Sequence, residues 1–442
     1  MHTLQKVTHS RLPLWALPKD WPRQGSHTAL ADIEFKGDKI DRITPSALFE
    51  NSSPWAASAP ALMPSLMQTH DAVLDLKGAL VLPGLMDAHT HIDKTLTLER
   101  IGEVKPGLLN AIQAMMLDRA QWSPSDIRSR ATQALQWAHA AGVCHLRTHC
   151  DWWEPKTTPL AWEVIKDLAT EWHSRIQVSR SALIPLNLFK DLNTALELAK
   201  VVSHSNAPSH RACLGGFIHT SNWDPQALKH LFEAAQRFEL DVDLHVDEEL
   251  QPSAQGLQSI ATLVTEMKFH GRVVCGHTCA LAQKSDKEAL GILDQVAQSG
   301  LTLVTLPVTN LWLQDATPHR TPRLRGMTLI KEARARGIPV LMGSDNVQDP
   351  FCAMGSYDPL EAMIIGTPMG QLGQAFDHWS QSICQTAWLQ SKYESASAHA
   401  LQPGAQANLV IFTQANATGF PSQTLPRVIV RDARVLQGTT LF

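Results

Sequence analysis

Short apolar runs alternate with segments of helical periodicity from about Ala79 to Ser344. Short apolar runs bounded by turn residues are typical of buried strands, whereas apolar positions that recur every three or four residues indicate amphipathic helices. Eight runs fit the strand pattern: 79–89, 142–149, 176–185, 212–219, 240–246, 271–277, 301–307 and 338–345. The clearest predicted helices, most of them ending at a glycine that can terminate a helix, are 124–142, 225–238, 286–300 and 325–337.

This alternation predicts an α/β protein built on a (β/α)8 barrel of the TIM type. An open, doubly wound sheet is the main alternative. The barrel is favoured because polar side chains that could bind a ligand stand at the C-terminal ends of most strand runs. Barrel enzymes place their active sites at that end of the strands.

Both ends of the chain show short strands and turns instead. The strands are predicted within 29–43, 72–84, 404–412 and 427–438. We predict that residues 1–80 and 400–442 pair into a small β-sandwich domain, and that 81–399 form the catalytic barrel. Residues 51–65 are rich in Pro, Ser and Ala and are predicted to be an irregular surface loop, and 380–401 a helix.

Composition narrows the class of protein. The 442 residues include 38 Lys and Arg against 42 Asp and Glu, so charge gives no reason to expect a nucleic acid or a membrane surface as partner. Seven scattered cysteines without C-x-x-C spacing indicate neither a disulfide framework nor a cysteine zinc site. No run reaches transmembrane length and the N-terminus lacks a signal-peptide core, so a cytoplasmic protein with a small-molecule ligand is expected.

The first strand run ends with His89 and His91, one residue apart. Positions i and i+2 of a strand face the same side, so these two imidazoles can bind one metal ion. His245 ends the fifth run and Asp345 the eighth, which a barrel brings next to strand one. Asp345 could be a metal ligand or accept a proton from water, or it could cap the following helix. A metal site with ligands from several strand ends is therefore predicted.

Glu248 follows His245 by three residues and is our first choice for proton transfer beside a metal-bound water. For its neighbours Asp247 and Glu249 the simplest expectation is that they are charged side chains exposed to solvent. His277 ends the sixth run, where a histidine is either catalytic or a hydrogen-bonded rim residue. Weaker candidates for substrate contact also follow strand ends: His149, His219, Asn310, Trp152, Trp153, Trp312 and Phe351.

The segments DAHTHIDKT, GVCHLRTHCD, HVDEE, GHTCAL and GSDNVQDPF resemble, in order, the strand-end motifs of the amidohydrolase superfamily in its cytosine deaminase-like branch. The resemblance implies one divalent ion, zinc or iron(II), on four ligands: His89, His91, His245 and Asp345. It also implies that Glu248 shuttles protons and that His277 orients the attacking water. The fourth run lacks the lysine that binuclear relatives use, which agrees with one ion.

Two positions depart from cytosine deaminases and make cytosine a doubtful substrate. Leu186 stands where those enzymes carry a glutamine that binds the pyrimidine amide edge, and leucine offers no hydrogen bond. Asn187 could replace it if the loop shifts by one residue. Asn346 replaces an aspartate and is similar to the branch that contains N-isopropylammelide amidohydrolase. Lys94, just beyond the first strand, joins these residues among the predicted substrate contacts.

The first hypothesis is metal-dependent hydrolytic deamination of a pyrimidine-, triazine- or purine-like ring, with release of ammonia. The alternative is a metal-dependent amidohydrolase that removes an alkylamine or opens a cyclic amide. A third hypothesis, a non-enzymatic barrel with structural histidines, requires chance placement of all the ligand-type residues. The resemblance further implies a homo-oligomer.

Overall fold

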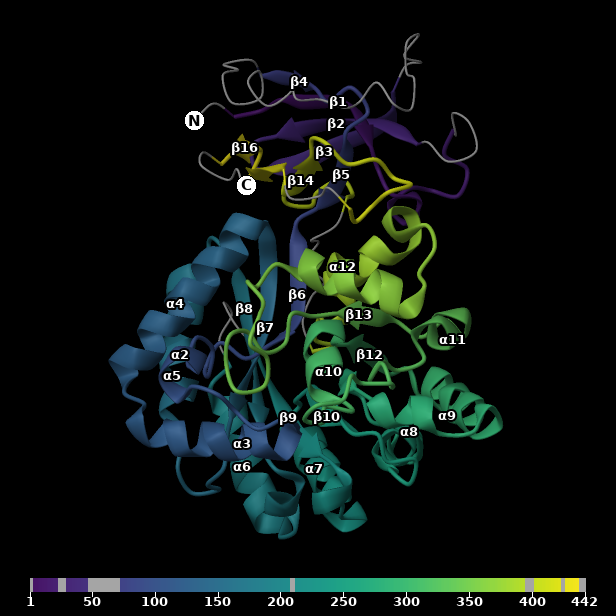
Figure 1. Ribbon diagram of the computed structural model, residues 1–442. Helices are drawn as coiled ribbons and strands as arrows, with labels where there is room; N and C mark the ends of the chain where they lie inside the picture. The colour runs from purple at the N-terminus through teal and green to yellow at the C-terminus, as the bar shows by residue number, and fades with distance from the viewer. Residues whose placement is uncertain are drawn as a thin grey trace.

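The computed structural model describes residues 3–22, 29–46, 72–206, 211–393, 401–422 and 426–436. Two eight-stranded sheets organise these residues. One sheet is built from both ends of the chain and lies above a barrel surrounded by helices (Figure 1). The predicted loop over 51–65 lies outside the described residues.

The barrel strands follow one another in chain order and run parallel throughout. They are β6 (Leu85–Thr90), β7 (Val143–Asp151), β8 (Gln177–Leu183), β9 (Ala212–Ile218), β10 (Val242–Val246), β11 (Val273–His277), β12 (Thr302–Thr305) and β13 (Val340–Met342). A bridge between Thr90 and Asp345 brings the last strand against the first, and Asp345 N donates to His89 O at 2.8 Å. The predicted (β/α)8 barrel is confirmed, because an open sheet would keep these two strands apart.

Helices cover the outside of the barrel. They are α2 (Leu98–Ile101), α3 (Leu108–Asp118), α4 (Pro124–Ala141), α5 (Leu160–Trp172), α6 (Leu192–His204), α7 (Pro225–Arg237), α8 (Gly256–Met267), α9 (Asp286–Ser299), α10 (Pro307–Leu313), α11 (Ile330–Ala335) and α12 (Pro359–Gly370). Ser123 caps α4 by accepting from Asp126 N, and Gly142 ends it in the left-handed conformation, as the sequence predicts. Gly300 ends α9 in the same way.

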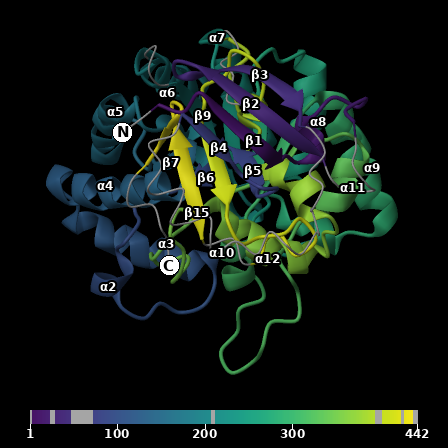
Figure 2. The ribbon, with the colours of Figure 1, turned by 90° about the horizontal axis from the view of Figure 1, so that it is seen from above.

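The terminal sheet joins both ends of the chain. Its strands are β1 (Lys6–Arg11), β2 (Leu30–Lys36), β3 (Lys39–Pro45), β4 (Val73–Asp75), β5 (Leu80–Pro83), β14 (Leu409–Phe412), β15 (Arg427–Arg431) and β16 (Arg434–Val435). β5 lies between β1 and β14 and so connects the N-terminal strands to the C-terminal ones. Seen from above, the yellow strand β15 shares a layer with the purple strands β1, β2 and β3 (Figure 2).

The apolar run 79–89 is two strands rather than the single strand predicted. β5 belongs to the terminal sheet and β6 to the barrel, and Gly84 stands between them. A Cβ atom at Gly84 would lie 1.9 Å from Cys144 Sγ, so only glycine fits at this crossing. The break follows from packing between the two sheets, which hydrophobic periodicity does not report.

Buried ion pairs hold the terminal sheet against the barrel side. Arg11 Nη2 lies 2.8 Å from Asp377 Oδ2, and both side chains are buried. Arg427 of β15 pairs in the same way with Asp358, which caps α12. Removing one member of a buried pair is costly, so these contacts fix where the barrel lies relative to the sheet.

The helix predicted over 380–401 is wrong for its described part. Residues 380–393 contain only two short 3-10 helices, Ser380–Ile383 and Thr386–Trp388, and 394–400 lie outside the described residues. Barrel side chains bind the carbonyls that a helix would use: Arg147 Nη2 donates to Leu389 O at 2.8 Å. Leu389 itself packs among barrel strand residues. Tertiary contacts therefore override the local helical pattern.

All seven cysteines are buried, and none is paired in a disulfide. Over the residues that the structure describes, no helix has both the length and the apolar character needed to span a membrane.

Candidate active site

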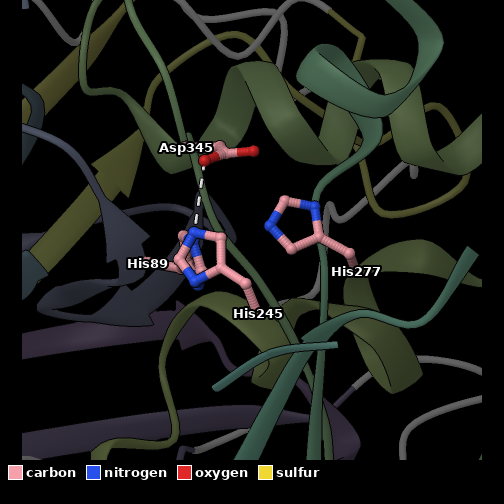
Figure 3. Close-up of side chains that lie close together, drawn as sticks. All are labelled: His89, His245, His277 and Asp345. Atoms are coloured by element: carbon pink, nitrogen blue, oxygen red, sulfur yellow. Dashed lines mark hydrogen bonds and ion pairs between the residues drawn. The ribbon is translucent and has the colours of Figure 1, made fainter. Parts of the chain in front are cut away.

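Four of the predicted side chains converge at the C-terminal mouth of the barrel. His89 lies in β6 and His91 directly follows that strand, while His245 lies in β10. Asp345 takes part in the bridge that closes the barrel. His245 Nε2 lies 3.1 Å from the Nε2 atoms of both His89 and His91. Asp345 Oδ1 lies 3.2 Å from His91 Nε2 and 3.6 Å from His89 Nε2. Figure 3 shows the imidazoles of His89 and His245 close together, the Asp345 carboxylate above them, and His277 facing them.

These separations suit ligands of one divalent ion. Zinc bonds nitrogen and oxygen at about 2.0–2.2 Å, which separates neighbouring ligand atoms by about 3.0–3.5 Å. Burial, helped by neighbouring imidazoles and by Lys94 near His91, holds the pKa of the three histidines well below the usual value. Each ring is therefore neutral and offers a lone pair to a metal.

Asp345 is the acidic member of the cluster. Burial raises the pKa of its carboxyl well above the usual value, with a further contribution from Asp349. Both of its oxygens are buried; the nearby Thr309 hydroxyl lowers the pKa of the carboxyl, but neither oxygen makes a hydrogen bond of ordinary geometry among the described residues. Buried acceptors without a donor are rare in native proteins, whereas a bound cation would satisfy them. The donor set therefore fits a metal ion.

His277 and Glu248 stand beside this cluster. His277 Nδ1 lies 3.4 Å from Glu248 Oε1 and accepts a hydrogen bond from Asn310 Nδ2 at 3.0 Å. Burial lowers the pKa of His277 to about 3, so its ring is neutral and Nε2 carries the proton. That Nε2 atom is buried and has no partner within the described part of the chain. His89, His245, His277 and Asp345 together offer ligand atoms that all lie within 4.8 Å of one another.

Glu248 differs from the two carboxylates beside it. Burial, followed by the charge of Asp345, raises the pKa of Glu248 well above its usual value. Asp247 instead accepts hydrogen bonds from the backbone of α8, and Glu249 from Thr220 N at 2.7 Å. Both are buried, so the interpretation of Asp247 and Glu249 as solvated charges is wrong. The three neighbouring carboxylates therefore have different partners: Asp247 binds the backbone of α8, Glu249 binds Thr220, and Glu248 lies beside His277.

The backbone is strained where two of the side chains enter the site. His277 has a φ of 65° and Asp345 a φ of 63°, in the left-handed region that non-glycine residues seldom adopt. Such a residue costs on the order of 1–3 kcal/mol and commonly marks a functional position. Asp345 leads into no helix before Pro359, so the alternative that it caps the next helix is wrong.

His149 packs against the cluster and is absent from the cavity lining. Its ring lies beside that of His89, with centroids 3.9 Å apart and planes tilted by 33°. Asp243 Oδ1 lies 3.8 Å from His149 Nε2, while Arg147 Nη1 donates to Asp243 Oδ2 at 2.9 Å. His149 therefore packs against His89 and does not line the substrate cavity.

A cavity opens above the cluster. Its polar lining consists of His91, Lys94, Asp151, His245, Glu248 and Asn346. Its apolar lining consists of Leu108, Ile112, Met115, Trp153, Leu183, Pro185, Phe217 and Phe351. Aromatic faces with a few convergent polar groups are typical of pockets for flat ring compounds.

Four predicted substrate contacts line this cavity: Lys94, Trp153, Asn346 and Phe351. Lys94 Nζ lies 2.6 Å from Asp151 Oδ1 and 5.0 Å from the centre of the Phe351 ring. Asn346 Nδ2 donates to Asp349 Oδ2 at 2.7 Å, so that amide is already engaged. Lys94 and Asn346 thus enter the cavity with fixed partners, and Phe351 supplies a flat wall.

Other predicted contacts lie elsewhere. Leu186 is buried in the hydrophobic core, Asn187 is exposed, and the preceding Pro185 lines the cavity instead. Asn310 reaches His277 rather than the cavity. The remaining weak candidates are also outside its lining: Trp152 in the core, Trp312 at 47% exposed, and His219 at the start of a short helix.

Sequence reasoning missed two parts of the lining. Asp151 is the last residue of β7, two residues after His149, and its place at a strand end was a usable signal. The helix α3 was not predicted, although Leu108, Ile112 and Met115 recur at helical spacing after Gly107. Both features belong to the wall of the cavity.

Comparison with known proteins identifies the family. A model of the amidohydrolase family matches residues 131–435, which is more than half of the chain. The chain belongs to the amidohydrolase family. This membership confirms the resemblance and the predicted enzyme class, a hydrolase that acts on carbon–nitrogen bonds.

Two relatives and one solved structure that are similar to this chain are named as deaminases or amidohydrolases. Pterin deaminase from Rhizobium rhizogenes is 32% identical over 400 residues, which cover 90% of this chain and 88% of the relative. N-isopropylammelide isopropyl amidohydrolase from Pseudomonas is 24% identical over 66% of this chain and 70% of the relative. The crystal structure of 5-methylcytosine deaminase from Klebsiella pneumoniae shares the fold, with a TM-score of 0.76 and 22% identity over 98% and 97% of the two chains.

Proposed function

We propose that this amidohydrolase is a metal-dependent deaminase that removes an amino group from a nitrogen heterocycle and releases ammonia. The observation that carries the proposal is the convergence of three histidines and Asp345 beside Glu248, which lines an aromatic-walled cavity. Deamination needs a source of hydroxide, a proton carrier and a flat binding pocket, and the site offers residues for each.

The substrate we propose first is a 2-amino-4-oxopteridine, the ring system of a pterin. The relative named pterin deaminase supports this choice by its identity over 90% of the chain. The aromatic rings of Trp153, Phe217 and Phe351 in the cavity wall can pack against a planar bicyclic ring. Cytosine is not proposed, because Leu186 lies outside the cavity and offers no amide.

We propose one divalent ion per chain, zinc or iron(II), held by His89, His91, His245 and Asp345. When bound, such an ion lowers the pKa of water to about 7 and so supplies hydroxide near neutrality. A single ion is supported by the absence of lysine from β9. A homo-oligomer, expected from the resemblance, is proposed alongside and is checked by light scattering.

The protein's own residues would move the protons. Glu248, whose pKa burial raises well above its usual value, would protonate the ring nitrogen next to the reacting carbon. Asp345 would take the proton from the attacking water, and the N–H of His277 would hold the attacking oxygen in place. Asn310 keeps His277 in the required tautomer. The proton held by Asp345 then passes to the amino group, the carbon–nitrogen bond breaks and ammonia leaves. The proton of the added hydroxyl returns to Glu248 as the ring carbonyl forms, and the ring nitrogen keeps the proton that it received.

A second candidate function changes only the leaving group. The Pseudomonas relative and Asn346 favour removal of an alkylamine. The same acid and base would serve, so the products distinguish the two. Ammonia loss supports the first function, alkylamine loss the second, and simple addition of water would indicate opening of a cyclic amide.

The test is a panel of rings offered to the zinc- or iron(II)-loaded protein. The panel contains 2-amino-4-oxopteridine, aminopyrimidines, aminotriazines and aminopurines, each with and without an N-alkyl group. We expect ammonia in proportion to ring converted, fastest with the pteridine. Metal-loaded protein that releases neither ammonia nor an amine from any member would overturn the proposal.

A further inference from the structure

Besides the histidines of the metal cluster, two residues of the cavity lining carry a buried polar atom that has no partner among the described residues. Asp151 is 4% exposed and lines the cavity; Lys94 binds its Oδ1, and its Oδ2 is buried without a hydrogen bond among the described residues. Trp153, two residues further on, lines the same cavity, and its Nε1 is likewise buried without an acceptor in the described chain. One atom is an acceptor and the other a donor.

The position of Asp151 is fixed on every other side. Its backbone N donates to Asp93 Oδ2 at 2.9 Å, and Lys94 holds Oδ1 at 2.6 Å. The segment around Asp93 is itself tied to α4, because Arg130 Nη1 donates to Asp93 O at 2.8 Å. Oδ2 is the side-chain oxygen without a hydrogen bond among the described residues, and the contacts of Oδ1 and of the backbone hold the side chain in place.

An unpaired buried acceptor and an unpaired buried donor both cost stability, and native proteins rarely keep them without a use. Asn346, the amide in the lining, is already engaged with Asp349. Leu186 stands where cytosine deaminases carry the glutamine that binds the amide edge of the ring, and its side chain lies in the core. Beside the remaining donors of Lys94, Asp151 and Trp153 offer one acceptor and one donor whose buried atoms have no partner among the described residues.

We propose that Asp151 and Trp153 determine substrate specificity by hydrogen bonding to the lactam edge of the ring, meaning its N–H and the neighbouring acceptor. This inference rests on the proposed deaminase function. Asp151 Oδ2 accepts a hydrogen bond from the ring N–H, and Trp153 Nε1 donates one to the neighbouring carbonyl oxygen or ring nitrogen. The ligand class is an amino-oxo heterocycle that offers an N–H and an acceptor on one edge. Rings in which the lactam nitrogen is alkylated lose the first contact.

These contacts lie on a part of the ring that is not transformed. They are present in both the bound substrate and the transition state, so their removal raises KM and leaves kcat nearly unchanged. A residue that acted only through the fold would instead change thermal stability or the fraction of active enzyme. A rise in KM with an unchanged kcat would therefore identify Asp151 and Trp153 as residues that bind the substrate.

The test compares three variants of the metal-loaded protein on 2-amino-4-oxopteridine. Trp153→Phe removes the N–H and keeps the ring, and we expect KM to rise about tenfold, the size of one lost hydrogen bond. Asp151→Asn turns an N–H toward the ring N–H, and we expect KM to rise about 100-fold, the size of a lost charged hydrogen bond. Trp162→Phe is the matched control, because Trp162 Nε1 is also buried without a partner among the described residues but lies outside the cavity lining.

Each outcome separates the two proposals. If wild-type enzyme releases ammonia and both cavity variants keep its KM, the edge-reading inference is overturned and the deaminase proposal stands. If wild-type enzyme converts no ring on the panel, the proposed function fails and this inference fails with it. If Asp151→Asn does not fold, Trp153→Phe alone decides.

Methylation of the lactam nitrogen must also raise KM for wild-type enzyme more than for Asp151→Asn, because these two changes remove the same contact.

Discussion

The metal-binding side chains and the cavity wall meet at one mouth of the barrel, but different parts of the chain build them. His245 stands on a barrel strand that pairs with a neighbour on each side, and the carbonyl of His89 accepts a hydrogen bond from Asp345 N across the closure of the barrel. Ile112, Trp153 and Phe351 come from a rim helix and from loops that follow the strands. Strand ends hold chemistry in a rigid frame, whereas loops and added helices set which substrate enters. Substitutions in the two regions should therefore affect different kinetic constants.

The largest effect is expected at the metal-binding side chains. His89→Ala removes a ligand, so metal affinity should fall by more than about 100-fold and ammonia release should drop to background. Metal analysis of the purified variant measures the loss. His173→Ala, at an exposed histidine, is the control. A His89→Ala protein with full metal content and activity would remove His89 from the site.

Glu248→Gln should separate metal binding from proton transfer. The amide cannot deliver a proton, so kcat should fall by about 10²–10⁴-fold while metal content is retained. Glu249→Gln is the neighbouring control, since Thr220 and not the cavity engages that carboxylate. An unchanged kcat for Glu248→Gln would mean that another group carries the proton.

Asn310→Leu tests the positioning of His277. Loss of the hydrogen bond to Nδ1 frees the ring to adopt the other tautomer, and kcat should fall about tenfold with KM and metal content unchanged. Steady-state kinetics at several pH values are the measurement. A rise in KM without a change in kcat would place Asn310 in substrate binding instead.

The smallest effect is expected in the wall itself. Ile112→Ala removes apolar contact from α3, so KM should rise about three- to tenfold while kcat stays the same. Leu117→Ala changes the opposite side of the same helix, where the side chain is 72% exposed, and should leave both constants unchanged. Equal effects from the two variants would mean that α3 acts through stability.

The same contrast explains what could be predicted from sequence. The pair His89 and His91 is visible because strand periodicity places both on one face, and the later strand ends supply the remaining ligand-type residues. The break at Gly84 could not be predicted, since it depends on Cys144 across the crossing. Leu186 was placed at the cavity by register, but a tight turn after Ile184 presents Pro185 there and buries Leu186. Contacts of this kind arise only when distant segments pack together.

The central claim is that a bound divalent ion and the strand-end side chains together release ammonia from an amino-oxo heterocycle. The most direct measurement counts ions per chain and ammonia released from 2-amino-4-oxopteridine in three states: as purified, after chelation, and after return of zinc or iron(II). We predict one ion per chain, loss of ammonia release on chelation with the circular dichroism of the fold retained, and recovery when the metal returns. Undiminished ammonia release from the metal-free protein would contradict this account.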